Sequence, residues 1–371
     1  MNKLILTIVC LLSFLGQARA QETPINQLYI EPFVVKANGT VDVDVMLNNP
    51  DFEGHSFQFR LYVPDGLRIA ERLVGGKMRY VYSPSSRIKE TDPDYGLLWQ
   101  FGITIETGTD KNGFYYLFKC IDPIGDLPGI QGTSGSLMTI TLKASDQIST
   151  GVLNIAIRNQ VISDATGDDG RRPDDYEVDA TGQIDVTVSD AGYATFSWPR
   201  TLDFSQTGLK VYRAAVLELD NDNGQMTTAL IEDGIVAANE GVLLKGSTGQ
   251  YNPTTTDATP TSADNFFKGT AGGEVIPTAE QYYYVFARKQ NGNTGFYKVQ
   301  TGVTIPQYKA YLDLNRDLSR ITFDLAEEAT GIRDLQNGST DELYDLRGVK
   351  QNSQKQRKGV YIQNGKKVVI K

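Results

Sequence analysis

The chain has 371 residues, with 36 Lys or Arg against 45 Asp or Glu and a formal net charge of −9. Eight of the basic residues fall within 347–371, which holds no acidic residue, so residues 21–346 carry 26 basic and 45 acidic side chains and a net charge of −19. Nucleic-acid binders present a basic footprint. We therefore expect no nucleic-acid partner, and we interpret the acidity as a contribution to solubility.

The first 20 residues have the three parts of a secretory signal peptide. Lys3 precedes an apolar run from Leu4 to Leu15, and Ala18-Arg19-Ala20 forms an A-x-A cleavage site. A membrane anchor is the alternative, but a bilayer-spanning helix needs about 20 apolar residues. We expect cleavage after Ala20, export of the chain and no transmembrane span.

Apolar and polar residues alternate with period two in most of the chain after residue 20, which predicts strands. In 41–47 valine or leucine occupies every second position, and 57–63 repeats the pattern before the turn residues Pro64-Asp65-Gly66. Further strands are predicted at Arg79–Tyr82, Leu97–Ile105, Gly113–Phe118, Leu137–Leu142, Val152–Ile157 and Gln183–Val188. The fold class is therefore all-β, and an antiparallel β-sandwich is expected over residues 21–189.

The rest of the chain divides into three predicted parts. Residues 190–326 form a second β-rich domain, with a long solvated loop at Tyr251–Ala263, where Thr and Pro are frequent. Residues 327–341 are predicted to be a linker. Residues 342–371 form a small C-terminal β segment of two or three strands around the polar stretch Gln351–Lys358.

The stretches SFQFRLYVPDGL, GTSGSLMTITLKA and VLNIAIRNQVISDATG resemble the cohesin-like β-sandwich. Cohesins resemble carbohydrate-binding modules in fold and bind dockerin modules in cellulosomes, so the resemblance implies a recognition domain. The middle block, with AGYATFSWP, GVLLKG and IPQYKAYLDL, resembles a module that recurs in exported proteins of Gram-negative anaerobes.

The terminal stretch LYDLRGVKQNSQKQRKGVYIQNGKKVVIK resembles the end of type 9 secretion C-terminal sorting domains. In that family the segment directs passage through the outer membrane, followed by surface attachment or release. The resemblance implies an interaction with export machinery and a cell-surface or extracellular location rather than the periplasm. The matching residues are Tyr344, Asp345, Leu346, Gly348, Gly359, Tyr361, Gly365, Lys366 and Lys367. A basic hairpin that caps the preceding domain is the first alternative, and contact with anionic lipid is the second.

The sequence contains few candidate catalytic residues. His55 is the only histidine and precedes a strand in a turn, and Cys120 is the only cysteine after the signal peptide. Its apolar neighbours favour a buried, inert thiol. The sequence has no Walker A loop, no strand followed by GxGxxG and no G-x-S-x-G elbow. We therefore expect a non-catalytic protein without a cofactor.

Two acidic loops are candidate Ca²⁺ sites because Ca²⁺ binds clustered oxygen ligands. One contains Asp164, Asp168 and Asp169, and the other contains Asp220 and Asp222. Neither matches the EF-hand spacing, so solvated turns are the preferred interpretation.

Four aromatic residues are candidate platforms for a sugar ring, namely Tyr80, Tyr82, Trp99 and Tyr283. Sugar faces stack on rings while their hydroxyls form hydrogen bonds. The predicted function is binding of a glycan or a surface protein through the sandwich. The alternatives are an enzyme of polysaccharide degradation, which predicts paired carboxylates in a cleft, and a surface-layer or fimbria-like subunit, which predicts an unpaired edge strand.

Overall fold

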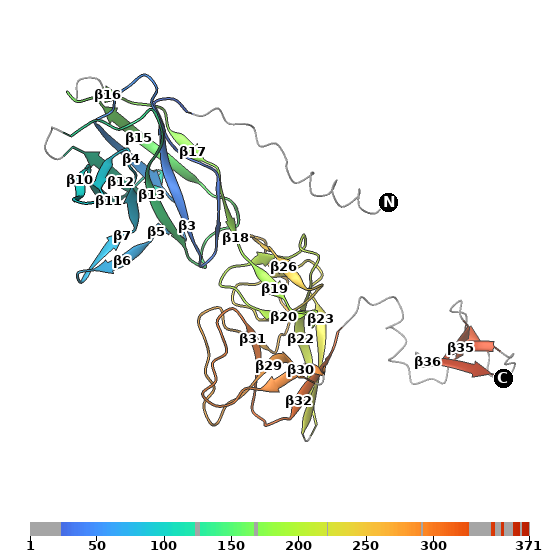
Figure 1. Cartoon of the computed structure of the whole chain (residues 1–371). Coiled ribbons are helices and arrows are strands. Elements are labelled where there is room, and N and C mark those ends of the chain that lie inside the picture. The colour runs from blue at the N-terminus through green and yellow to red at the C-terminus, as the bar shows by residue number, and fades with distance from the viewer. Residues whose placement is uncertain are drawn as a thin grey trace, which may run out of the picture. The chain divides into compact units, whose positions relative to one another are not determined.

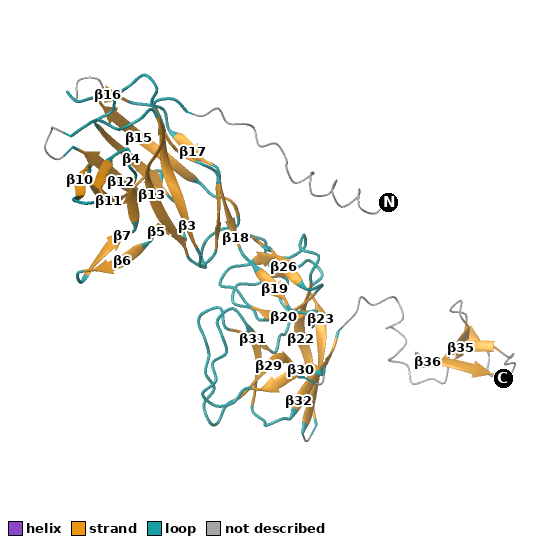
Figure 2. Ribbon diagram, viewed as in Figure 1, coloured by secondary structure: helices purple, strands orange, loops and turns teal. Residues whose placement is uncertain are grey.

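The computed structural model describes residues 24–122, 127–166, 170–220, 222–290 and 292–325, and the backbone of four short strands after residue 342. All regular elements in these residues are strands (Figure 2). The predicted all-β fold class is therefore confirmed. A search of the same residues finds no helix with the length and hydropathy needed to cross a membrane. The predicted signal peptide, residues 1–20, lies outside the described residues.

The chain divides into two compact units. The first ends its main segment at Thr187, close to the predicted boundary at 189, and also takes Pro199–Thr207 and Gln250–Asp257 from the predicted second domain. The second consists of Val188–Trp198, Gly208–Gly249 and the residues from Ala258 onward. Each unit is therefore assembled from separate stretches of chain.

Two antiparallel sheets form a sandwich in the first unit (Figure 1). One sheet has the order β1 (Leu28–Ile30), β3 (Thr40–Asn48), β13 (Ser134–Ala144) and β5 (Leu67–Ile69), and β8 (Tyr82–Pro84) also pairs with β13. The other has the order β11 (Gly102–Asp110), β12 (Gly113–Ile121), β4 (Ser56–Tyr62), β15 (Ile155–Ser163) and β16 (Gly170–Arg171), and β17 (Tyr176–Val178) also pairs with β15.

The period-two pattern explains how these sheets bury one face each. Val45 and Leu47 on β3 are fully buried, and so are Phe59 on β4 and Phe118 on β12, whose rings stack at 4.6 Å. Successive side chains of a strand point to opposite faces. The same alternation therefore sends the intervening residues of β4 and β12 outward, where the candidate site lies.

Smaller ribbons complete the unit: β2 (Phe33–Lys36), β14 (Gly151–Val152) and β18 (Ala180–Gln183) in one sheet, the hairpins β6 (Glu71–Val74) with β7 (Lys77–Tyr80) and β9 (Lys89–Asp92) with β10 (Gly96–Gln100), the pair β21 (Leu202–Asp203) with β27 (Thr254–Thr255), and β19 (Val186–Val188) at the unit's boundary. Four predicted strands are therefore wrong as single elements. Arg79–Tyr82 is divided between β7 and β8, Leu97–Ile105 between β10 and β11, Val152–Ile157 between β14 and β15, and Gln183–Val188 between β18 and β19.

Arg87 is a buried cation that fastens the ends of β3 and β13. Its guanidinium donates five hydrogen bonds of 2.6–2.9 Å, and no carboxylate of the described residues pairs with it. The acceptors are the carbonyls of Leu47, Gln131, Gly132 and Gly135 and the side chain of Asn49. Burial lowers the pKa of Arg87. Complete hydrogen bonding is what makes a buried charge tolerable.

The second unit contains one nine-stranded sheet. Its order is β20 (Tyr193–Phe196), β25 (Val242–Lys245), β22 (Lys210–Leu219), β23 (Asn223–Leu230), β32 (Arg320–Asp324), β30 (Thr294–Lys298), β29 (Tyr282–Arg288), β31 (Ala310–Leu314) and β28 (Phe267–Gly269). Two short strands, β24 (Ile235–Val236) and β26 (Gly249–Tyr251), lie outside it. The sheet is curled, so that its last strand approaches its third strand. The amide of Phe266, next to β28, donates to the carbonyl of Ala214 on β22 at 2.9 Å.

A buried ion pair holds the Thr- and Pro-rich loop against this sheet. Arg213 on β22 donates to Glu240 through Nε at 2.5 Å, and the two side chains are 6% and 13% exposed. Arg213 also donates to the carbonyl of Thr261 at 2.9 Å, and Asn265 donates to Glu240 at 3.0 Å. The end of the predicted solvated loop is therefore anchored.

Four short strands are described in the predicted C-terminal segment. They pair in the order β34 (Lys350–Gln351), β33 (Leu343–Asp345), β35 (Gly359–Gln363) and β36 (Lys366–Ile370). These strands include Tyr344, Asp345, Gly359, Tyr361, Lys366 and Lys367 of the sorting-like motif, whereas Leu346, Gly348 and Gly365 lie outside the described residues. Sorting through this segment stays a prediction.

We expect Arg87→Met to destabilise the first unit by about 3 kcal/mol or more, because it removes the donors of several buried carbonyls at once. Arg68→Met is the matched control, since Arg68 is half exposed and bonds only two carbonyls, an exposed one of Pro64 and a part-buried one of Leu67. The measurement is denaturant-dependent hydrogen exchange of the whole chain, followed in β3 and β13 by mass spectrometry. Equal destabilisation by the two substitutions would contradict the role given to Arg87.

Candidate functional site

The outward side of the β11–β12–β4–β15 sheet is the candidate site, and we call it the outer face. Its residues form three rows across the strands: Gly108, Tyr115, Tyr62 and Ala156; Glu106, Leu117, Arg60 and Arg158; and Thr104, Lys119, Gln58 and Val161. The rows follow directly from the antiparallel register, because residues opposite one another project to the same side. Tyrosine, arginine and leucine thus meet at the middle of the sheet.

Gly108 makes room for Tyr115, whose ring lies across the neighbouring strand β11. A Cβ atom at Gly108 would fall within 2.4–3.0 Å of the Tyr115 ring and hydroxyl. Real Cβ atoms do not approach other atoms so closely, so a side chain at this position would displace the Tyr115 ring. The orientation of Tyr115 on the outer face therefore depends on a residue with no side chain of its own.

Arginine and tyrosine side chains are interleaved beside this ring. The Arg60 guanidinium lies 4.5 Å from the centre of the Tyr115 ring, and Arg158 lies 5.6 Å from that of Tyr62. The Tyr62 and Tyr115 rings are 5.3 Å apart. Cation–π contacts of this length hold long arginine side chains in defined positions. The tyrosine and arginine side chains of the first two rows of the outer face are therefore held in place before any partner binds.

Asp110, at the end of β11, fixes two members of this group. Tyr62 donates to Asp110 Oδ2 at 2.6 Å, and Arg60 Nη1 donates to the same oxygen at 3.1 Å. The hydrogen bond from Tyr62 is the main reason that the pKa of Asp110 lies below its ordinary value. Burial is the main reason that the pKa of Tyr62 lies above its ordinary value. At neutral pH Asp110 is ionised and Tyr62 keeps its proton.

The remaining charges of the outer face are also paired. Lys119 donates to Glu106 at 2.8 Å. Arg158 contacts Glu177 at 2.8 Å and Asp175 at 3.4 Å. Because each cation has a carboxylate beside it, the outer face carries no strong field of one sign, which is unlike a surface built for a polyanion.

Two apolar residues of β12 complete the site. Leu117 is partly exposed at the centre of the middle row, and Ile121, at the end of β12, is 53% exposed. A partly desolvated apolar centre with tyrosine and arginine around it is the composition that energetically important protein interfaces favour. The sheet itself supplies a rigid backbone under these side chains.

The predicted aromatic platforms do not converge on one site. Tyr80 and Tyr82 lie on different strands and pack against the sandwich core, with the Tyr80 ring 5.5 Å from that of Tyr116. Tyr283 belongs to the second unit, is 6% exposed and packs on Tyr311 at 4.8 Å. Its ring is covered, so Tyr283 offers no platform.

Trp99, on β10, lies beside a hollow of about 460 Å³. Glu90, Thr91 and Gln131 contribute polar groups to the lining, and the Trp99 Nε1 donates to Glu90 Oε2 at 2.5 Å. Small-molecule sites commonly have volumes of this size and combine a few polar groups with an aromatic wall. Of the four predicted platforms, Trp99 is thus the one that lines a hollow.

The two acidic loops contain no assembled cation site in the described residues, where no group of three or more His, Cys, Asp or Glu could hold a metal ion. Asp164 accepts hydrogen bonds from Thr166, at 3.1 and 3.2 Å. Asp220 and Asp222 lie in the turn between β22 and β23, where the amide of Asp220 donates to the carbonyl of Asn223 at 2.8 Å. Asp168 and Asp169 lie outside the described residues.

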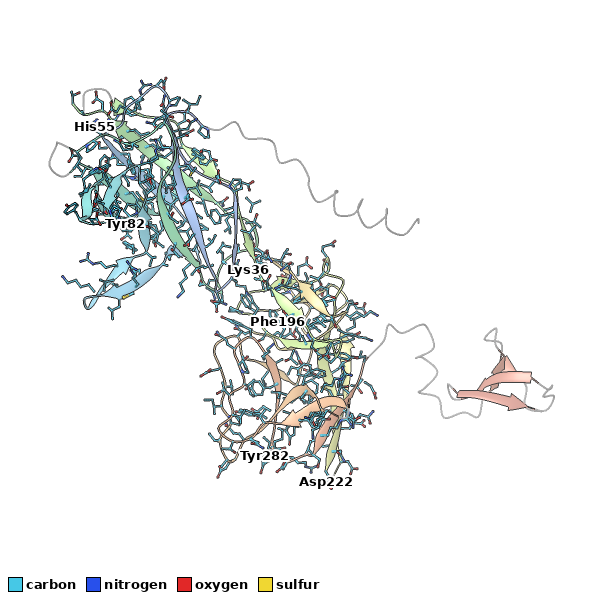
Figure 3. The ribbon with its side chains drawn as sticks, in the orientation of Figure 1. Lys36, His55, Tyr82, Phe196, Asp222 and Tyr282 are labelled. Atoms are coloured by element: carbon cyan, nitrogen blue, oxygen red, sulfur yellow. The ribbon has the colours of Figure 1, made fainter. Side chains whose placement is uncertain are left out.

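His55 and Cys120 are placed where sequence reasoning put them. His55 lies at the end of the sandwich where β4 begins, and its Nε2 is 3.6 Å from Glu53 (Figure 3). Cys120 is buried in β12, and burial raises the pKa of its thiol far above the ordinary value. A protonated, buried thiol is a poor nucleophile.

No protein-family model and no curated protein matches this sequence. Solved structures of cohesins are similar to part of it. A cohesin of Clostridium thermocellum, solved in a type I cohesin–dockerin complex, has 13% identity and a TM-score of 0.29, covering 42% of this chain and 99% of that chain. The third cohesin of ScaC of Acetivibrio cellulolyticus, in complex with the ScaB dockerin, has 16% identity and a TM-score of 0.29, with coverages of 42% and 99%. A non-cellulosomal cohesin of Archaeoglobus fulgidus has 15% identity and a TM-score of 0.25, with coverages of 43% and 87%.

Proposed function

We propose that this chain is an exported, non-catalytic binding protein whose N-terminal sandwich holds a protein partner on the outer face. The observation that carries the proposal is the ordered group of Tyr115, Arg60 and Tyr62 around Leu117 on a rigid sheet. The cohesin-like sequence pattern of the same domain is consistent with a recognition role. A dockerin-like module, or another small folded domain, is the class of partner we propose.

The chemistry of the outer face favours a protein over a polyanion or a small metabolite. Its charges are neutralised within the face, so binding would depend on shape and on burial of tyrosine, arginine and leucine. A sheet surface is also broad and open instead of enclosed like a pocket, which suits contact with the surface of a second protein. These properties support partner recognition without any reaction.

The absence of catalysis is part of the proposal. It is supported by the buried, protonated state of Cys120 and by the position of His55 beside Glu53, with no nucleophile identified next to it among the described residues. A polysaccharide-degrading enzyme and a surface-layer or fimbria-like subunit are the alternatives, and neither follows from the outer face.

Export is proposed from the two ends of the sequence. Residues 1–20 have the pattern of a signal peptide, and the stretch from Glu342 to Lys371 has the pattern of a sorting segment. Together these segments would bring the binding domain to the cell surface or the medium.

Leu117→Asp on the outer face should weaken partner binding by about 30-fold or more, because a buried unpaired carboxylate would replace the apolar centre. Thr40→Asp is the matched control, since Thr40 is exposed on the opposite sheet and lies opposite Lys143. The whole chain and both variants serve as bait for the envelope and secreted proteins of the source bacterium, and the retained protein is then titrated by calorimetry. Retention that is equal for both variants would exclude the outer face as the binding surface.

Gly108→Ala gives an independent test of the same face, with the other side chains of the three rows unchanged. It should move Tyr115 and reduce affinity, whereas thermal unfolding should change little because the added methyl group is at the surface. Unchanged affinity in this variant would count against a role for the Tyr115 ring.

Glycan binding is a second candidate function, and the hollow beside Trp99 favours it. Trp99→Ala should reduce retention on a glycan array by about tenfold, because the stacking surface is lost. Tyr95→Ala is the control: Tyr95 is 85% exposed in the same hairpin and does not line the hollow. If the unsubstituted chain retains no glycan, or if Trp99→Ala and Tyr95→Ala reduce retention equally, the hollow is not a glycan site.

The export proposal is tested by removing residues 342–371 and fractionating cells of a Gram-negative host that has type 9 secretion machinery. The full chain should appear at the cell surface or in the medium, and the shortened chain should stay in the periplasm. The same distribution for both chains would show that the segment does not sort the protein.

A further inference from the structure

A second surface on the sandwich unit, separate from the outer face, is the hairpin formed by β6 and β7, which projects from the unit (Figure 1). Its two-residue turn is Gly75-Gly76, with φ angles of 57° and 76°. Positive φ at both positions matches the twist of a tight hairpin and favours glycine. The ribbon pairs only with itself, so both of its outer edges are unpaired strand edges in the described sheets.

The two faces of this hairpin differ in chemistry. Leu73 lies opposite Met78 on one face, and these side chains are 69% and 56% exposed. Arg72 lies opposite Arg79 on the other face, and Lys77 continues that face toward the turn. The hairpin is therefore an amphipathic ribbon with an apolar side and a basic side.

The basic side lacks counter-charges. Arg72, Lys77 and Arg79 take part in no ion pair with a described residue, although residues 21–346 as a whole carry a net charge of −19. Like charges directly opposite each other in a ribbon are destabilising. In contrast, the outer face of the same unit pairs its cations with carboxylates. An external anion would relieve the repulsion that the hairpin retains.

We propose that the β6–β7 hairpin adds an extended acidic segment of a partner protein as a third strand. In such a segment acidic and apolar residues alternate. A strand on the free edge of β6 would place its acidic side chains beside Arg72 and its apolar side chains beside Leu73. A strand on the free edge of β7 would place them beside Arg79 and Met78 instead. Main-chain hydrogen bonds to the edge would supply affinity, and the alternation would supply specificity.

The arrangement favours a strand over a lipid surface. A membrane-inserting hairpin would carry its apolar side chains at the tip, but here the tip is Gly75-Gly76 and the adjoining pair is Val74 with Lys77. The cations extend along the ribbon at two-residue intervals instead of forming a collar above an apolar tip. That spacing matches the repeat of an extended chain.

The test uses the whole chain and a short fluorescent peptide in which Glu and Val alternate, with binding followed by anisotropy. The double substitution Arg72→Gln, Arg79→Gln should weaken binding about tenfold or more because it removes the opposed cations. Leu73→Ser should weaken binding less but measurably. The control is Lys143→Gln, Arg172→Gln, which makes the same change in net charge elsewhere on the unit. All substituted side chains are at the surface, and unchanged hydrogen exchange in β3 and β13 would confirm folding.

Three further probes decide between explanations. A peptide with Lys in place of Glu should not bind, and a Glu–Val peptide with a central Pro should bind weakly, because Pro cannot complete a strand ladder. Equal binding of the Pro peptide, or equal loss in the control variant, would overturn strand addition in favour of a diffuse charge effect. Binding of phosphatidylglycerol vesicles through Arg72 and Arg79, without binding of the Glu–Val peptide, would overturn it in favour of a membrane surface.

Discussion

The sandwich depends on one buried positive charge that no carboxylate in the described part of the chain neutralises. Arg87 gives all five of its donors to carbonyl and amide oxygens near the end of β3 and the start of β13. Since β3 and β13 are the central pair of their sheet, this cation fixes where the pairing of β13, the longest described strand, begins. The bulge between Ser136 and Met138 lies next to it. The register of the pair decides which side chains enter the core that both sheets share.

The unit carries two surfaces that differ in how they treat charge. On the outer face, Arg60 and Arg158 are held by carboxylates and by tyrosine rings, so their conformations are set before any partner arrives. On the β6–β7 hairpin, Arg72 and Arg79 face each other without such support. Preordered side chains reduce the entropy lost on binding. Unpaired charges instead act at long range and accelerate encounter in a salt-dependent way.

The sequence was informative where one face of a strand is apolar and the other is polar. The alternation in 41–47 and 57–63 correctly predicted β3 and β4. It could not reveal the outer face, because β12 has aromatic residues on both sides: Tyr115 faces outward and Phe114 and Tyr116 face inward. The same ambiguity makes Tyr80 and Tyr82 look like platforms in the sequence, because an aromatic residue in a strand does not by itself indicate which face it occupies.

Other features depended on contacts between distant parts of the chain. The β6–β7 hairpin has a local signal, a Gly-Gly pair between two short runs, but its polar residues masked the strand pattern. No local signal distinguishes Arg87 or the Arg213–Glu240 pair from surface charges, because each acquires its partners only when remote loops meet. Burial of charge is a tertiary property.

Gly108 gives the outer face an unusual vulnerability. The position has no side chain and would be passed over in any inventory of binding residues, yet the Tyr115 ring occupies the space that a methyl group would take. Related sequences could therefore keep every tyrosine, arginine and leucine of the outer face and still present a different surface. When such sequences are compared, glycine at this position indicates that the tyrosine arrangement is retained.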